Sequence, residues 1–154
     1  MISLKQTLKA ITSKFSALNT LLNDVPHYTL LWTNPNPTSS FSAQTISLDL
    51  SKYDAVEVVF KRYTSQAIYS TQTLLEKGIK FALGTTTDET FRYRTCSFSN
   101  SGVTFDTPQY MPSYGSWNPT ATNNNCEIPY KIYGIKFGGG YKALRSLFAK
   151  EVAV

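Results

Sequence analysis

The long segment 106–125 holds the side chains best suited to binding a ligand. It combines aromatic rings with an amide, at Tyr110, Tyr114, Trp117 and Asn118. Aromatic faces stack on sugar rings and amides hydrogen-bond sugar hydroxyls, so we predict a carbohydrate-binding loop without secondary structure. The same mixture suits protein contacts of the kind made by antibody loops. A third possibility is that the aromatic rings fold inward as a lid stiffened by the prolines.

Residues that could support catalysis are sparse. His27 is the single histidine, and it directly follows Pro26 at the end of a predicted helix. A serine or cysteine nucleophile that acts through a histidine base would need this residue beside it. The acidic residues are isolated in turns and on strand faces, which argues against the paired carboxylates of a glycosidase. We therefore predict no catalytic residues and a protein that is not an enzyme.

Metal and cofactor sites are also not indicated. Cys96 and Cys126 do not form a C-x-x-C pair, so zinc or redox chemistry is not expected. Both cysteines fall in or beside predicted strands, so a disulfide between them is geometrically possible. No secretory signal is recognisable, however, so we expect two reduced, half-buried thiols. The asparagines at 118 and 123–125 with Asp106 could offer oxygens to calcium but lack the several carboxylates of a calcium site. The glycines at 138–140 lack the strand–helix context of a phosphate-binding loop. We predict neither metal nor cofactor.

Charge and hydropathy exclude two further classes of protein. The net charge is +5, but the basic residues are scattered along the chain rather than gathered in a stripe. This distribution argues against nucleic-acid binding, although the surplus charge would suit an anionic polymer such as a phosphate-bearing glycan. No apolar run approaches the roughly 18 residues of a membrane span, so no membrane insertion is expected.

An N-terminal helix is predicted from the apolar spacing in residues 1–25. Apolar residues recur at alternating intervals of three and four positions, at Met1, Leu4, Leu8, Ile11, Phe15, Leu18, Leu22 and Val25. This heptad pattern places an apolar seam along a helix of roughly 37 Å, and Pro26 ends it. We predict oligomerisation through Leu4, Leu8, Ile11, Phe15, Leu18 and Leu22, as a homotrimer rather than a dimer because Phe15 is large for a dimer seam. The alternative is an amphipathic helix folded back on its own domain.

The central region, 28–137, alternates apolar and polar residues with the period of β-strands. Strands are expected near residues 28–32, 46–50, 56–61, 73–75, 79–84, 91–98, 103–105 and 128–137. Short strands separated by turns, including a hairpin turn at 76–78, predict a mainly β fold, an antiparallel β-sandwich or jelly-roll head. Residues 138–154 are predicted to form a glycine hinge and a short C-terminal helix. Three parts therefore follow: an oligomerisation helix (1–25), a head (28–137) and this tail.

Three stretches of the chain resemble recurring elements of phage and prophage tail-fibre or minor structural proteins. They are L-W-T-N-P-N-P from Leu31, F-S-A-Q-T-I-S-L-D-L from Phe41 together with Tyr53-Asp54, and C-E-I-P-Y-K-I-Y-G-I-K from Cys126. Together they span most of the predicted head. The resemblance is to proteins of bacteriophages that infect Gram-positive or gut bacteria.

This resemblance implies a trimeric β-sandwich head on a coiled-coil stalk, located in the virion. The implied partners are other virion proteins and a host cell-wall or surface glycan. A purely architectural virion component, such as a decoration or baseplate part, is the alternative, and a glycan-degrading enzyme is the third hypothesis. The resemblance supplies no binding residues, so the candidates in 106–125 rest on residue chemistry alone.

Overall fold

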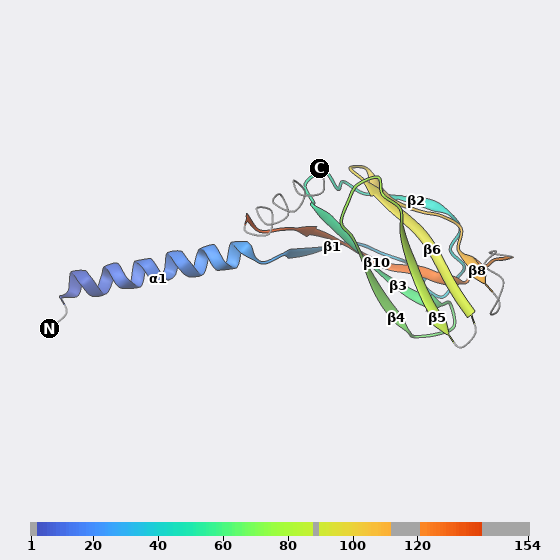
Figure 1. The fold of residues 1–154 in the computed structure, drawn as a ribbon, viewed down its shortest axis with the longest axis horizontal. Coiled ribbons are helices and arrows are strands. Elements are labelled where there is room, and N and C mark those ends of the chain that lie inside the picture. The colour runs from blue at the N-terminus through green and yellow to red at the C-terminus, as the bar shows by residue number, and fades with distance from the viewer. Residues whose placement is uncertain (1–2, 88–89, 112–120, 140–154) are drawn as a thin grey trace, which may run out of the picture. The chain divides into compact units, whose positions relative to one another are not determined.

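The computed structural model describes residues 3–87, 90–111 and 121–139. One compact unit comprises Tyr28–Ile135, and a second comprises Met1–His27 with the chain from Lys136 onward. Within the described residues the fold is mainly β, with antiparallel sheets and one N-terminal helix (Figure 1). The prediction of a mainly β protein with an N-terminal helix is therefore confirmed. The predicted C-terminal helix lies outside the described residues.

Helix α1 spans Leu4–Asp24 and begins with a capping box. The hydroxyl of Ser3 accepts from the backbone N–H of Gln6, and the Gln6 side chain accepts from the backbone N–H of Ser3. This exchange satisfies two amides that lack partners within the helix. Val25 leaves the helix in an extended conformation, as expected for the residue before Pro26.

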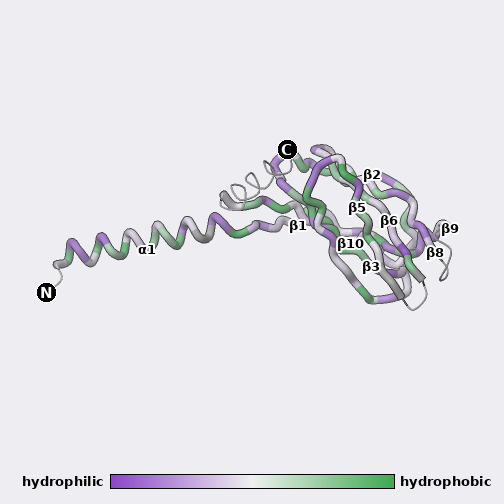
Figure 2. The backbone as a smooth tube through the Cα atoms, viewed as in Figure 1, coloured by the Kyte–Doolittle hydropathy of each residue, from purple (hydrophilic) through white to green (hydrophobic). Residues whose placement is uncertain are grey.

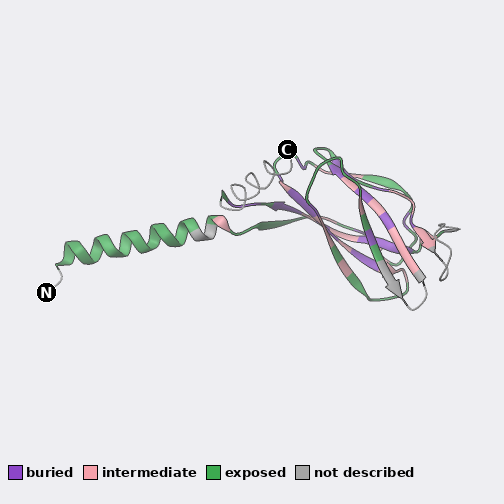
Figure 3. Cartoon of the chain, in the orientation of Figure 1, coloured by how far each residue is buried: buried purple, intermediate pink, exposed green. Residues whose placement is uncertain are grey.

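The seam predicted on α1 is exposed. Leu4 is 77 % exposed and Ile11, the least exposed of the described seam residues within the helix, is 46 % exposed. The helix is exposed along almost all of its described length, and hydrophobic and hydrophilic residues interleave along it (Figures 2 and 3). Leu22 belongs to the helix, but its side chain lies outside the described part of the structure.

Two sheets account for the strands. The first has the order β1-β10-β3-β4, and the second has the order β2-β7-β6-β8-β9 with β5 also paired to β6. The strands are β1 His27–Thr33, β2 Gln44–Ser47, β3 Ala55–Tyr63, β4 Tyr69–Leu74, β5 Phe81–Thr87, β6 Thr90–Ser99, β7 Gly102–Phe105, β8 Gln109–Met111, β9 Ala121–Thr122 and β10 Cys126–Lys136.

The two sheets share one cluster of buried apolar side chains. Val58, Phe60 and Ile132 come from the first sheet, and Phe98 and Phe105 come from the second. Each strand contributes alternate residues, because successive side chains point to opposite faces of a sheet. A single core between two antiparallel sheets is a sandwich-like arrangement, in keeping with the period of the sequence.

The predicted hairpin turn at 76–78 is wrong. The strands on either side of it belong to different sheets, since β4 pairs with β3 and β5 pairs with β6. The segment is a crossover between sheets, in which Gly78 adopts a positive φ of 80°. Strand period shows which residues share a face, but it does not identify the pairing partner.

The prediction that 106–125 lacks secondary structure is wrong at its two ends. Strand β8 pairs with β6, and β9 pairs with β8, near the beginning and end of this segment. Both strands are short, and β9 is only two residues long. Strands this short carry no periodic signal of their own; β8 is held by pairing with β6, and β9 by pairing with β8.

Glycine at position 134 is required by close packing inside the first sheet. A Cβ on Gly134 of β10 would lie 2.6 Å from the ring of Tyr53, which is itself buried in the core. The ring therefore rests directly on the β10 backbone. This contact also fixes the segment between β2 and β3, to which Tyr53 belongs.

We expect Gly134→Ala to lower the free energy of unfolding by about 1–3 kcal/mol, because the methyl group must displace the Tyr53 ring. Urea unfolding followed by circular dichroism measures the change. Gly139→Ala is the matched control, since a Cβ there has its nearest neighbour at 3.8 Å. Equal stability of the two variants would show that the Tyr53 ring moves aside at no cost.

Candidate functional site

The segment predicted to bind a ligand is held at both ends by one side chain, that of Arg94 on β6. Its guanidinium donates to the backbone oxygen of Asp106 at 2.8 Å and to that of Glu127 at 2.9 Å. It also donates to the backbone oxygen of Phe41 at 2.7 Å, and more weakly to that of Cys126 at 3.4 Å. Arg94 therefore joins the two ends of 106–125 to each other and to the segment before β2.

Arg94 is fully buried, which is unusual for a charged side chain. Burial lowers the pKa of its guanidinium to about 10, so the group stays protonated at neutral pH. The ring of Phe41 lies 5.2 Å from the guanidinium carbon and adds a cation–π contact. The planar fork of donors suits several carbonyl oxygens at once, which an ammonium group cannot match.

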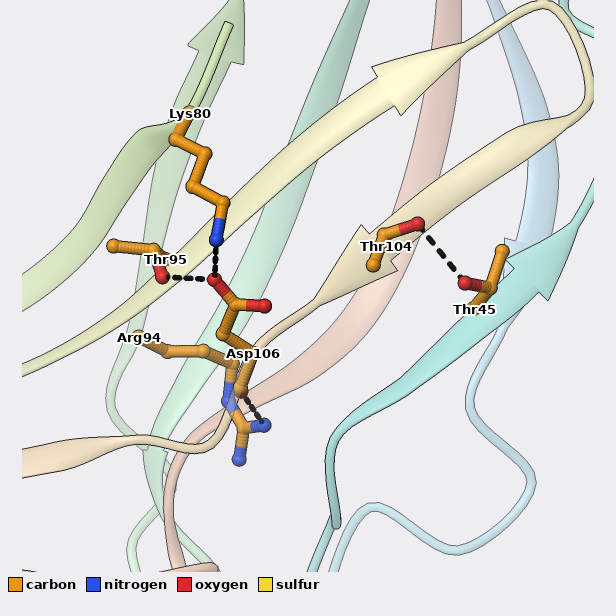
Figure 4. Close-up of polar contacts among 6 residues, drawn as sticks. All are labelled: Thr45, Lys80, Arg94, Thr95, Thr104 and Asp106. Carbon is orange, nitrogen blue, oxygen red and sulfur yellow. Dashed lines mark hydrogen bonds and ion pairs between the residues drawn. The ribbon is translucent and has the colours of Figure 1, made fainter. Parts of the chain in front are cut away.

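Asp106 fixes the start of the segment through its side chain. Its Oδ2 accepts from Lys80 Nζ and from Thr95 Oγ1, each at 2.6 Å (Figure 4). The hydrogen bond from Lys80, followed by that from Thr95, lowers the pKa of the Asp106 carboxyl below its usual value. Figure 4 also shows Arg94 donating to the backbone of Asp106, so one residue is held by its side chain and its main chain.

Tyr110 is the single predicted ligand-binding residue whose position the structure describes. It lies on β8 directly opposite Arg92 of β6, and the Arg92 guanidinium carbon is 5.1 Å from its ring centroid. The ring of Tyr63, at the end of β3 in the other sheet, lies 4.8 Å from the same carbon. Tyr63, Arg92 and Tyr110 are all half-buried and form a cluster that links the two sheets.

Tyr114, Trp117 and Asn118 fall in 112–120, outside the described residues. Their prediction as ligand contacts therefore stays a prediction. The C-terminal end of the segment forms hydrogen bonds through its main chain. The backbone oxygen of Asn124 accepts from the N–H of Phe41, and the backbone oxygen of Asn125 accepts from the N–H of Thr64.

Arg92 and Tyr63 are members of the cluster that sequence reasoning did not select. A signal was present, since Arg92 and Arg94 are two residues apart and must point to the same face of a strand. That face is the buried one, because Arg94, Cys96 and Phe98 are all buried. Two arginines on an inward face indicate polar partners inside the fold. The alternation of residue types along β6 is enough to predict this.

Both cysteines are free and buried rather than half-buried. Burial raises the pKa of the Cys96 thiol to about 12 and that of the Cys126 thiol to about 11. Both groups are therefore protonated at neutral pH and poor nucleophiles. The Cys126 thiol donates to the backbone oxygen of Asn123 at 3.1 Å, a structural contact at the end of the segment.

Among the described residues, no three His, Cys, Asp or Glu side chains gather closely enough to hold a metal ion. None of the helices in the described ranges combines the length and apolar character that a membrane span requires. No protein-family model matches the chain, and neither a curated protein nor a solved structure shows significant similarity to it.

We expect Arg94→Lys to lower the free energy of unfolding by roughly 3 kcal/mol or more, because an ammonium group cannot reach all of the carbonyl oxygens and leaves buried acceptors unsatisfied. Chemical unfolding measures the loss. Arg62→Lys provides the matched control: Arg62 is a half-buried strand arginine whose Nε has no hydrogen-bond partner among the described residues. Arg62→Lys should stay within about 1 kcal/mol of the native chain. A loss at Arg94 no larger than this would refute the role assigned to its guanidinium.

Proposed function

We propose that this protein is a fibre-type structural component of a phage virion, assembled as a homotrimer, that attaches to a glycan on the host surface. The observation that carries the proposal is the exposed apolar seam on α1. The resemblance of the head to phage tail-fibre elements supports it. The finer features of the fold, a coiled coil, a jelly-roll head and a C-terminal helix, belong to the same proposal.

The seam needs a partner because it costs free energy to hold it in water. Leu4, Leu8, Ile11, Phe15 and Leu18 all expose close to half of their surface or more. Burying an apolar side chain of this size contributes about 1.5–3 kcal/mol. Further copies of the same helix carry the same apolar seam and can pack against it. Self-association is therefore the simplest way to bury the seam.

The size of the Phe15 side chain is the argument for three copies. Phe15 is 68 % exposed, and a shallow hollow beside it is lined by Thr12, Ser16, Leu18 and Asn19. A large ring at this heptad position fits the wider centre of a trimer better than the narrow seam of a dimer. The hollow gives the side chains of a neighbouring helix a place to insert, as in knobs-into-holes packing.

Glycan attachment is assigned to the segment after β7. Tyr110 with Arg92 and Tyr63 forms its described base, and Tyr114, Trp117 and Asn118 supply further aromatic and amide groups. Each head would bind weakly, and three linked heads raise the effective concentration for the second and third contacts. Copy number therefore compensates for low affinity at each site.

An architectural role is the alternative, and one observation favours it. Tyr110 and Tyr63 are half-buried, and each has a face in contact with Arg92. Rings engaged in this way have less surface to offer a sugar. In the architectural role the segment would contact other virion proteins, and the head would bind no glycan.

We expect the full chain to have a solution mass three times the 17.2 kDa of one chain, measured by light scattering. Ile11→Asp with Leu18→Asp should reduce it to the monomer, because two buried charges per helix would oppose association. The matched control is Ser13→Asp with Thr20→Asp, which adds the same charges at the same spacing on the opposite face of α1. Retention of the trimer in the Ile11/Leu18 variant would contradict assembly through the seam.

We expect the trimer to bind a subset of glycans on an array, and Trp117→Ala and Tyr110→Ala to weaken that binding about tenfold or more as stacking surface is lost. Tyr93→Ala is the control, because Tyr93 lies next to Arg92 on β6 but on the opposite face and stacks on Phe91 instead. If no glycan is bound at all, the architectural alternative is supported.

A further inference from the structure

The first sheet carries a second aromatic cluster, on strands that lie outside 106–125. The rings of Tyr69 on β4 and Tyr130 on β10 lie 4.9 Å apart between centroids, tilted by 43°. Tyr69 is 46 % exposed and Tyr130 is half-buried, and neither belongs to the shared core. Ile68, beside Tyr69, is also exposed. Solvent-accessible aromatic surface of this kind is available to a ligand.

An irregularity in β10 aims Tyr130 at its partner. Pro129 lies opposite Phe60 of β3, and Lys131 lies opposite Val59. Tyr130 is therefore an extra residue that has no paired residue on β3. This is a β-bulge, a feature that re-aims side chains and is often found beside binding sites. Asn34 holds the bulge in place: its backbone N–H donates to the oxygen of Tyr130, and its side chain donates to the oxygen of Pro129, both at 2.9 Å.

Two lysines adjoin the ring pair. The Lys131 ammonium lies 5.2 Å from the centroid of the Tyr130 ring. Lys61 lies on β3, which runs between β10 and β4, and is directly opposite Tyr69. Lys61 is only 6 % exposed, and its Nζ donates to the backbone oxygen of Thr64 at 2.8 Å.

The positive charge of this cluster is not neutralised by the described part of the chain. Neither Lys61 nor Lys131 forms an ion pair with any described carboxylate. Glu57, the acidic residue nearest along β3, lies opposite Tyr133 instead. Burying a cation without an anionic partner is costly, so an anion at this position would be stabilised.

We propose that Tyr69, Tyr130, Lys61 and Lys131 form a binding site for a sugar that carries a negatively charged group. The tilted ring pair provides an apolar platform for the face of the sugar ring. Lys131 contacts the carboxylate or phosphate, and Lys61 adds positive potential from below. This inference rests on the proposed function and adds a second glycan site to it, on the first sheet and for an acidic glycan.

The test is an array of glucuronate-, galacturonate-, sialate- and phosphate-bearing glycans, each beside its neutral counterpart, probed with the full chain. We expect binding to at least one acidic glycan and about tenfold weaker binding to its neutral counterpart. Lys131→Gln and Tyr69→Ala should each weaken binding by a similar factor. Lys52→Gln is the matched control, because Lys52 is an exposed lysine that makes the same kind of contact, 5.4 Å from the Tyr53 ring.

The outcomes separate this site from the proposed function as a whole. If Tyr110→Ala abolishes glycan binding while Lys131→Gln and Tyr69→Ala leave it unchanged, this inference is overturned and the attachment function stands. Equal binding to acidic and neutral glycans overturns the role of the two lysines. Binding to no glycan at all overturns both the inference and the attachment function. Circular dichroism of each variant shows that the loss of a ring or a charge has not unfolded the head.

Discussion

The head depends on one buried cation, the guanidinium of Arg94. It donates to four backbone oxygens from three separate segments, and no side chain of another type could donate to all of them at once. Its charge is screened by carbonyl dipoles and by the Phe41 ring rather than by water. Because each hydrogen bond goes to the main chain, Arg94 determines where those segments run, whatever side chains they carry. A segment anchored in this way can vary in sequence between its ends without losing its position.

The two aromatic clusters involve different strands of the two sheets, and each lies near a side chain that holds backbone oxygens. On β6, Arg94 faces the interior and joins the ends of 106–125. Arg92 lies two residues earlier on the same face and contacts the rings of Tyr63 and Tyr110. The Tyr69–Tyr130 pair lies on the other sheet and is positioned by a bulge that Asn34 holds. The first cluster is held by cation–π contacts beside the segment that Arg94 anchors, and the second is held by hydrogen bonds from Asn34 to backbone oxygens. Packing of the shared core then keeps the two sheets in register around them.

Sequence reasoning identified the elements more reliably than their connections. The helix and the strands with long alternating runs, such as β3 and β6, follow from periodicity, since burial of one face imposes it. Pairing partners depend on which edges meet in space, so the β4–β5 crossover was mistaken for a hairpin. The short β8 and β9 have too few residues for a period. The role of Arg94 was not predicted, because neither composition nor strand period shows which backbone oxygens lie inside the fold.

The helix presents a different physical problem from the head, because little in its own sequence stabilises it. It has no acidic residue in its first turn and no basic residue in its last. The favourable interaction of such charges with the helix dipole is therefore missing. Thr7, Thr12 and Thr20 direct their hydroxyls to main-chain oxygens four residues earlier, which satisfies the side chains but favours the helix little. A helix of this length is marginal alone, and its capping box secures only one end. Burial of the seam is the one large favourable term left, and it is available only in contact with another apolar surface. If the proposed self-association supplies that surface, folding of α1 and association through its seam would be a single coupled step, and protein concentration would control both.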